Sequence, residues 1–170
     1  MNLPSLLSRC QTEKGGITLS RIDVLVVEDD PMVAEIHQNF INTLEGFRVV
    51  AVAGDGAKAL ELLETLPVRL LILDIFLPGL DGLNTLRKIR EQQKNVDVII
   101  VSASRDVNTV NEAIQAGAFD YIVKPFVYER LKASLESFRQ METKLRRGPR
   151  DVAQADIDSL FQVKSRKNYQ

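Results

Sequence analysis

From residue 22 onwards, short apolar runs alternate with stretches in which apolar residues recur every three or four positions. The apolar runs are IDVLVV (22–27), RVVAVA (48–53), RLLILD (69–74), DVIIVS (97–102) and DYIVKP (120–125). Runs of this length, rich in aliphatic and β-branched residues, are typical of strands that are buried on both faces. The pattern therefore predicts five strands in the interior of one sheet.

The stretches between and after these runs have the spacing of five helices. Their expected buried positions are Val33, Ile36, Phe40 and Leu44; Ala57, Leu60 and Leu63; Leu83, Leu86 and Ile89; Val107, Val110 and Ile114; and Leu131, Leu135, Phe138, Met141 and Leu145. Strands that alternate with helices pair in parallel through right-handed crossovers and carry helices on both faces. We therefore expect one α/β domain over residues 22–145, a doubly wound five-stranded parallel sheet with the order 2-1-3-4-5.

The two ends of the chain lack this alternation. Residues 1–21 show no sustained period and contain a Gly-Gly pair, so we expect a flexible N-terminal extension. The segment RRGPR (146–150) is expected to end the last helix and to act as a hinge. Residues 146–170 are too few to form a second core, and we expect a linker toward a missing or truncated output domain. The basic residues near residue 170 suit either nearby nucleic acid or a solvated tail.

Composition narrows the classes of protein that remain. Hydrophobic residues make up 45% of the chain and charged residues 26%, and the net charge of -1 gives no global attraction to nucleic acid or to an anionic membrane. A single cysteine, Cys10, excludes an intramolecular disulfide, and a single histidine, His37, excludes a His-rich metal site. No run approaches the roughly 20 apolar residues of a membrane span. We expect a cytoplasmic protein without membrane contact, in which His37 has a structural or surface role.

Three acids follow the first and third predicted strands. Glu28 and Asp29 come directly after four apolar strand residues, and Asp74 ends LLILD. In open α/β sheets, ligands bind at the carboxyl ends of the strands where the strand order reverses, here between strands one and three. Clustered carboxylates repel one another, and Mg²⁺ suits one or two carboxylates together with phosphate oxygens. We predict a Mg²⁺ site at which Asp74, as a carboxylate nucleophile, accepts a phosphoryl group.

Two neighbouring acids have simpler explanations. Asp30 precedes Pro31 and Asp81 precedes Gly82, both at the predicted starts of helices. Asp is favoured as an N-cap and Pro in the first helical turn, so we expect both acids to cap helices.

The fourth and fifth predicted strands end in Ser102 and Lys124. The serine hydroxyl can donate to a phosphoryl oxygen. The lysine ammonium can pair with Asp74 before phosphoryl transfer and with the phosphoryl group afterwards. The Lys124–Pro125 bond is a candidate for the cis isomer, which occurs mainly before proline.

Four segments, VLVVEDDP, LLILDIFLPGLDG, VIIVSAS and GAFDYIVKPF, occur in this order. Together they resemble the receiver domain of bacterial two-component response regulators, which has a flavodoxin-like fold, over about residues 22–145. The resemblance implies that Asp74 is the phosphoacceptor, that Asp29 binds Mg²⁺ directly and Glu28 through water, and that the carbonyl oxygen of Phe76 is a further ligand.

The resemblance also implies a conformational switch and a control of hydrolysis. Lys124 would contact the phosphoryl group, Ser102 would move toward it, and Tyr121 would turn inward. The alternative for Tyr121 is packing against the fourth helix, and both arrangements can hold in different states. In the family, the residues at the positions of Phe76 and Ser104 influence how fast the acyl phosphate hydrolyses, so a bulky Phe76 is expected to shield it from water.

The implied function is a signalling receiver that takes a phosphoryl group from a sensor histidine kinase and switches an output. It is expected not to be an enzyme, with at most slow self-phosphorylation and self-dephosphorylation. The junction after residue 145 is similar to that of citrate- and malate-type regulators, which implies transcription control through a C-terminal helix-turn-helix DNA-binding domain. The faces of the fourth and fifth helices are candidates for homodimerisation on phosphorylation. The alternative is a stand-alone phosphorelay receiver acting through protein contacts. A phosphohydrolase would need an acid where Phe76 stands, and a nucleotide site would want a glycine- or hydroxyl-rich loop instead of EDDP.

Overall fold

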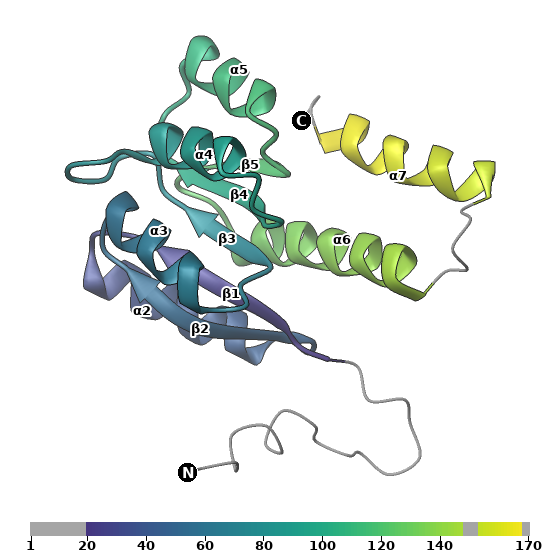
Figure 1. Cartoon of the computed structure of the whole chain (residues 1–170), viewed down its shortest axis with the longest axis horizontal. Helices are drawn as coiled ribbons and strands as arrows, with labels where there is room; N and C mark the ends of the chain where they lie inside the picture. Colours follow the sequence, from purple (N-terminus) through teal and green to yellow (C-terminus); the bar gives the residue numbers. More distant parts are fainter. Residues whose placement is uncertain (1–19, 148–152, 168–170) are drawn as a thin grey trace, which may run out of the picture.

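A five-stranded sheet lies at the centre of the computed structural model, which describes residues 20–147 and 153–167 (Figure 1). All strand pairs are parallel, in the order β2-β1-β3-β4-β5. The strands are β1 (Ile22–Val27), β2 (Phe47–Ala53), β3 (Leu70–Leu73), β4 (Asp97–Ser102) and β5 (Asp120–Val123). The predicted fold class, strand positions and strand order are therefore confirmed.

Six helices occur in the described part of the chain. They are α2 (Pro31–Thr43), α3 (Gly56–Thr65), α4 (Gly82–Glu91), α5 (Val107–Gln115), α6 (Tyr128–Arg147) and α7 (Gln154–Lys167). The first five were predicted, whereas α7 lies in the stretch that we expected to be a linker. The predicted N-terminal extension lies almost wholly outside the described residues. Of the predicted hinge RRGPR (146–150), the first two residues belong to α6 and the other three lie outside the described residues. None of the described helices has the length and apolar character needed to cross a membrane.

Helices cover both faces of the sheet, because successive side chains of a strand point to opposite sides. In β1, Val24 and Val26 join the core beneath α2 and α6, while Leu25 and Val27 join the core beneath α3, α4 and α5. Both cores consist almost entirely of aliphatic and aromatic side chains. This arrangement explains why the strand sequences are apolar without alternation.

The buried face of α2 differs from the prediction. The helix buries Ala34, His37 and Ile41, whereas the expected Ile36 is 46% exposed. Phe40, also expected, is partly buried against the same core. The spacing rule selected the large aliphatic residues of the helix, but a helix that lies flat on a sheet buries a narrow strip in which a small alanine allows close approach.

Similar corrections apply to four other expected core positions, which are exposed: Ala57, Val107, Ile114 and Leu145. In α3 and α5 the fully buried residues are the small Ala59 and Ala113. In α4, by contrast, Leu86 and Ile89 are fully buried as predicted. Large apolar side chains at the margins of a helix–sheet contact remain partly solvated, and this is common on protein surfaces.

Polar contacts attach α6 to the sheet and α7 to α6. The buried carboxylate of Asp120, at the start of β5, accepts two hydrogen bonds from Arg130 of α6, each 2.9 Å long. On the outer side of α6, Lys144 Nζ donates to Ser159 Oγ of α7 at 2.9 Å. Leu160 of α7 packs against the core beneath α2 and α6. The helix that follows the receiver-like fold is thus in contact with it.

Candidate metal-binding site

Backbone hydrogen bonds place the predicted site residues at one edge of the sheet. The ladder continues one residue beyond the strands, because Asp74 N donates to Val27 O at 3.1 Å and Lys124 N donates to Ser102 O at 2.9 Å. Glu28 N likewise donates to the carbonyl oxygen of the last residue of β2 at 3.0 Å. The side chains that follow β1, β3 and β5 therefore start from well-defined backbone positions.

The three predicted acids lie close together. One carboxylate oxygen from each of Glu28, Asp29 and Asp74 lies within 4.8 Å of the other two. Glu28 and Asp74 are buried and Asp29 is exposed, so the cluster opens to solvent on the side of Asp29. The backbone N–H of Phe76 donates to Asp74 Oδ1 at 3.1 Å, which fixes the orientation of this carboxylate.

Lys124 links two of these acids. Its Nζ lies 3.0 Å from Asp74 Oδ2 and 3.2 Å from Glu28 Oε2. Burial alone would lower the pKa of Lys124, but the hydrogen bonds and negative charges of Asp74 and Glu28 outweigh burial and raise this pKa above its usual range. The ammonium therefore stays charged at neutral pH. The Lys124–Pro125 peptide bond is cis, as considered from the sequence.

The donor set fits Mg²⁺. Every ligand atom in the cluster is a carboxylate oxygen, the kind of donor that this hard cation prefers. Burial raises the pKa of Glu28, and the neighbouring Asp74 carboxylate raises it further, while Lys124 opposes this rise. Two acids that crowd each other and are only partly neutralised by one lysine form a site that a divalent cation would stabilise.

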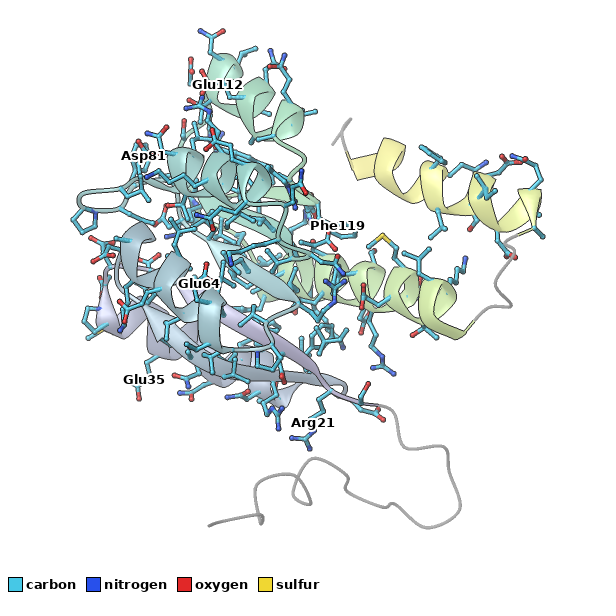
Figure 2. The ribbon with its side chains drawn as sticks, viewed as in Figure 1. Arg21, Glu35, Glu64, Asp81, Glu112 and Phe119 are labelled. Atoms are coloured by element: carbon cyan, nitrogen blue, oxygen red, sulfur yellow. The ribbon has the colours of Figure 1, made fainter. Side chains whose placement is uncertain are left out.

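The two acids assigned to helix capping do cap helices. Asp30 Oδ1 accepts from Met32 N at 2.9 Å at the start of α2. Asp81, labelled in Figure 2, accepts from Asn84 N at 2.8 Å at the start of α4. Neither carboxylate belongs to the acidic cluster. The sequence therefore separated the cluster acids from the capping acids correctly.

Ser102 and Tyr121 meet at Ser104 rather than at the acids. The Oγ of the fully buried Ser102 accepts from Ser104 N at 3.2 Å, and Tyr121 OH donates to Ser104 O at 2.8 Å. Tyr121 also packs against the core beneath α3, α4 and α5, in agreement with the packing alternative. The two predicted switch residues are thus joined through the loop between β4 and α5. Their switching role stays a prediction.

Two glycines allow the backbone of the loop after Asp74 to pack closely against neighbouring residues, which the sequence analysis did not predict. A Cβ at Gly82 would collide with the carbonyl oxygen of Asp74 and lie 2.7 Å from the Cα of Ile75. A Cβ at Gly56 of α3 would collide with the side chain of Thr85 and the carbonyl oxygen of Leu80. The DG pair that indicates a helix start in the sequence therefore also marks a close approach of two backbones.

His37 is also near the site, and its surface alternative is wrong. The side chain lies on the inner side of α2 and is 4% exposed. Its ring centroid is 5.9 Å from that of Phe126, two residues beyond Lys124. Burial lowers the pKa of His37, the positive charge of Lys124 lowers it further, and the negative charge of Asp74 opposes both. A periodicity search over apolar residues passes over a buried histidine.

The depressed pKa of His37 predicts a pH dependence of stability. The folded state binds this proton less tightly than the unfolded state, whose histidine has an ordinary pKa of 6.5. The contribution of His37 to the free energy of unfolding is thus complete above pH 6.5 and decreases as the pH falls toward the folded-state pKa, with a slope of at most about 1.4 kcal/mol per pH unit. Urea unfolding at several pH values between about 5.5 and 7.5 measures this slope.

The matched control for this prediction is His37→Gln. The chain has one histidine, so no other imidazole titrates in this range. The variant is expected to lose the part of the pH dependence that wild type shows just below pH 6.5. Parallel curves for wild type and variant would contradict the assignment of a depressed pKa to His37.

Comparisons with known proteins agree with this geometry. The family described as response regulator receiver domain matches residues 24–136. A protein of Bacillus subtilis named as the C4-dicarboxylate response regulator DctR is 41% identical over 140 residues, which cover 82% of this chain and 62% of the relative. The transcriptional regulatory protein MalR of the same organism is 37% identical over 84% of this chain and 61% of its own length. The chain therefore spans about three fifths of the curated relatives it matches.

Solved structures show the same likeness. The receiver domain of the Francisella response regulator 1452 is 32% identical, with a TM-score of 0.63, over 68% of this chain and 94% of that one. A chain in the CheX–CheY–BeF3–Mg²⁺ complex from Borrelia burgdorferi is 29% identical, with a TM-score of 0.64, over 69% of this chain and 89% of that one.

Proposed function

Because the chain belongs to the receiver-domain family of two-component response regulators, we propose that Asp74 accepts a phosphoryl group in a Mg²⁺-dependent reaction. The observation that carries this proposal is the contact of Lys124 with Asp74 and Glu28 inside the cluster of three acids. A metal site without catalysis would not require a half-buried ammonium against one of its ligands.

Each site residue then has a defined task. An oxygen of Asp74 attacks phosphorus, the bond between phosphorus and the leaving group of the donor breaks, and an acyl phosphate forms. Asp29, Asp74 and the carbonyl oxygen of Phe76 would hold Mg²⁺ directly and Glu28 would hold it through water, which would supply positive charge for the phosphoryl oxygens. The ammonium of Lys124 pairs with Asp74 before transfer and with a phosphoryl oxygen afterwards.

Ser102 and Tyr121 form the switch in this proposal. The Ser102 hydroxyl is fully buried next to the loop that carries Ser104, and Tyr121 OH is bonded to the backbone of that loop. A movement of Ser102 toward a new phosphoryl group would remove the acceptor of Ser104 N–H and rearrange the loop. A local change of charge would thereby alter the surface formed by α5 and β5.

The partners follow from the relatives. Several are named as transcriptional regulators, and this chain spans about three fifths of them. We propose that a sensor histidine kinase donates the phosphoryl group and that the output is transcription, through a C-terminal DNA-binding domain beyond α7. Homodimerisation on phosphorylation through α5 and α6 belongs to the same proposal.

Intact-mass spectrometry after incubation with acetyl phosphate tests the central step. With Mg²⁺ we expect one phosphoryl adduct, located by peptide mapping to the segment that contains Asp74. With a chelator in excess of the metal we expect none. The metal-free sample returned to Mg²⁺ is the control that the chelator did not unfold the protein. An adduct that forms equally without metal, or no adduct under any condition, would refute the proposal.

Phe76→Asn is expected to accelerate self-dephosphorylation. The backbone N–H of Phe76 donates to Asp74, and the Phe76 side chain is 59% exposed. We expect this bulky side chain to limit the access of water to the phosphoryl group on Asp74. We expect a rate constant of hydrolysis up to about tenfold higher, equivalent to about 1.4 kcal/mol in the barrier. Loss of the adduct with time, followed by mass spectrometry, measures this rate. An unchanged rate would show that Phe76 does not shield the acyl phosphate.

A further inference from the structure

Four aromatic rings form a row between α2 and the segment that follows β5. His37 and Phe40 come from α2, and Phe126 and Tyr128 come from that segment and the start of α6. The ring centroids are 5.9 Å apart for His37 and Phe126, 5.7 Å for Phe126 and Tyr128, and 4.5 Å for Tyr128 and Phe40. We call these four residues the aromatic row. Aromatic pairs at such distances are favourable beyond the area that they bury.

The aromatic row holds a segment that has few backbone contacts of its own. Lys124 N donates to Ser102 O, and the next backbone donor in the described chain is Arg130 N, which donates to Val127 O. Pro125 has no N–H, and the N–H groups of Phe126 and Val127 make no hydrogen bond to a described residue. Packing of side chains therefore fixes this segment, and Phe126 is the residue of the row that is nearest in sequence to Lys124.

His37 is the one member of the row that is buried rather than partly buried, and its ring is polar. Its side chain is 4% exposed, and its imidazole makes no hydrogen bond to another described residue. A buried polar group without a partner costs free energy, and each such group in a native protein calls for an explanation. The ring centroid of His37 lies 5.9 Å from that of Phe126, two residues beyond Lys124, and the positive charge of Lys124 contributes to the lowered pKa of His37.

We propose that His37 is a positioning residue for Lys124: its ring packs against Phe126 and thereby holds the segment after β5 so that the Lys124 ammonium stays between Glu28 and Asp74. His37 touches none of the reacting atoms and acts through Phe126. The kinetic consequence of this proposal rests on the proposed phosphoryl transfer to Asp74, but the position of Lys124 does not.

The first test is His37→Ala, which removes the ring. We expect the rate constant of phosphorylation by acetyl phosphate to fall about tenfold or more, because displacing a catalytic group by a fraction of an ångström is costly. The maximal rate should fall more than the apparent affinity for acetyl phosphate, since Lys124 acts on the phosphoryl group in transfer. His37→Phe, which restores a ring at this position, is expected to recover most of the rate.

Phe40→Ala is the matched control. Phe40 lies on the same helix and in the same row, but its ring pairs with that of Tyr128, four residues beyond Lys124 instead of two. This variant should lose comparable stability in urea unfolding and keep the wild-type rate of phosphorylation. An equal loss of rate in Phe40→Ala would mean that loosening α2 in general, not His37, affects the site, and would overturn the proposal.

A double-mutant cycle with Lys124→Ala separates positioning from an independent effect. If His37 acts through Lys124, then His37→Ala should change the rate little in the Lys124→Ala background. Additive losses would overturn the proposal.

A measurement without phosphorylation completes the test. The NMR signals of the Lys124 side chain in protein with isotope-labelled lysine, assigned by Lys124→Arg, should shift in His37→Ala and not in Phe40→Ala. If wild type takes up no phosphoryl group, the proposed function fails, and these signals still decide the role of His37. Unchanged Lys124 signals in His37→Ala would overturn the role.

Discussion

Asp74→Asn is expected to eliminate the phosphoryl adduct that wild type forms with acetyl phosphate and Mg²⁺. Asparagine preserves the size of the side chain and an acceptor for Phe76 N–H, but it lacks the anionic oxygen that attacks phosphorus. It also removes one of the three carboxylates of the cluster, which weakens the site for Mg²⁺. Intact-mass spectrometry of both proteins under identical conditions measures the effect, and we expect no detectable adduct in the variant.

Asp81→Asn is the matched control for this experiment. Asp81 lies in the loop that follows Asp74 and caps α4, and asparagine is an equally good N-cap. This variant should form the adduct at the wild-type rate. If the adduct persisted in Asp74→Asn and disappeared in Asp81→Asn, the phosphoacceptor would be Asp81 and the assigned chemistry would be wrong.

Gly82→Ala is expected to cause the largest loss of stability of the substitutions considered. The added Cβ would collide with the carbonyl oxygen of Asp74 and approach the Cα of Ile75 to 2.7 Å. Both obstacles are backbone atoms, which cannot rotate away, so the loop between β3 and α4 must move. Overpacking of this kind costs about 3 kcal/mol in the free energy of unfolding. Urea unfolding measures this loss, and because the loop carries Asp74, phosphorylation should slow as well.

Gly54→Ala tests whether the effect comes from the close approach or from glycine in general. A Cβ at Gly54 would meet no atom within 4 Å, so alanine there should change the free energy of unfolding by less than about 1 kcal/mol. Equal destabilisation by the two substitutions would contradict the steric explanation for Gly82.

The strands were predictable because their signal is local. In β1, Val24 to Val27 are all fully buried, and such a run is rare outside a strand covered on both faces. The helices were predictable in position but less so in orientation. In α2, Ala34 and His37 are buried beneath the helix together with Ile41, while Ile36 is 46% exposed. Hydrophobicity does not reveal which strip of a helix lies closest to a sheet when small or polar residues occupy it.

The acids of the site were predictable for a topological reason. Residues that directly follow strands of a parallel sheet reach the same edge, so Glu28, Asp29 and Asp74 could be placed together without coordinates. The contact of Lys124 with Asp74 agrees with the expected pairing, whereas its contact with Glu28 was not predicted. The domain boundaries and the individual roles of these residues stay predictions.

The amino-acid sequence by itself determined which residues form strands, how the strands alternate with helices, and that three acids and a lysine end at one edge of the sheet. These features depend on neighbouring residues and on the few ways in which parallel strands connect. Only the tertiary structure decided that His37 is buried against Phe126, that Gly82 touches the backbone of Asp74, and that α7 packs on α6. Each of these depends on distances between segments that are far apart in the sequence, and close packing sets such distances to within a fraction of an ångström.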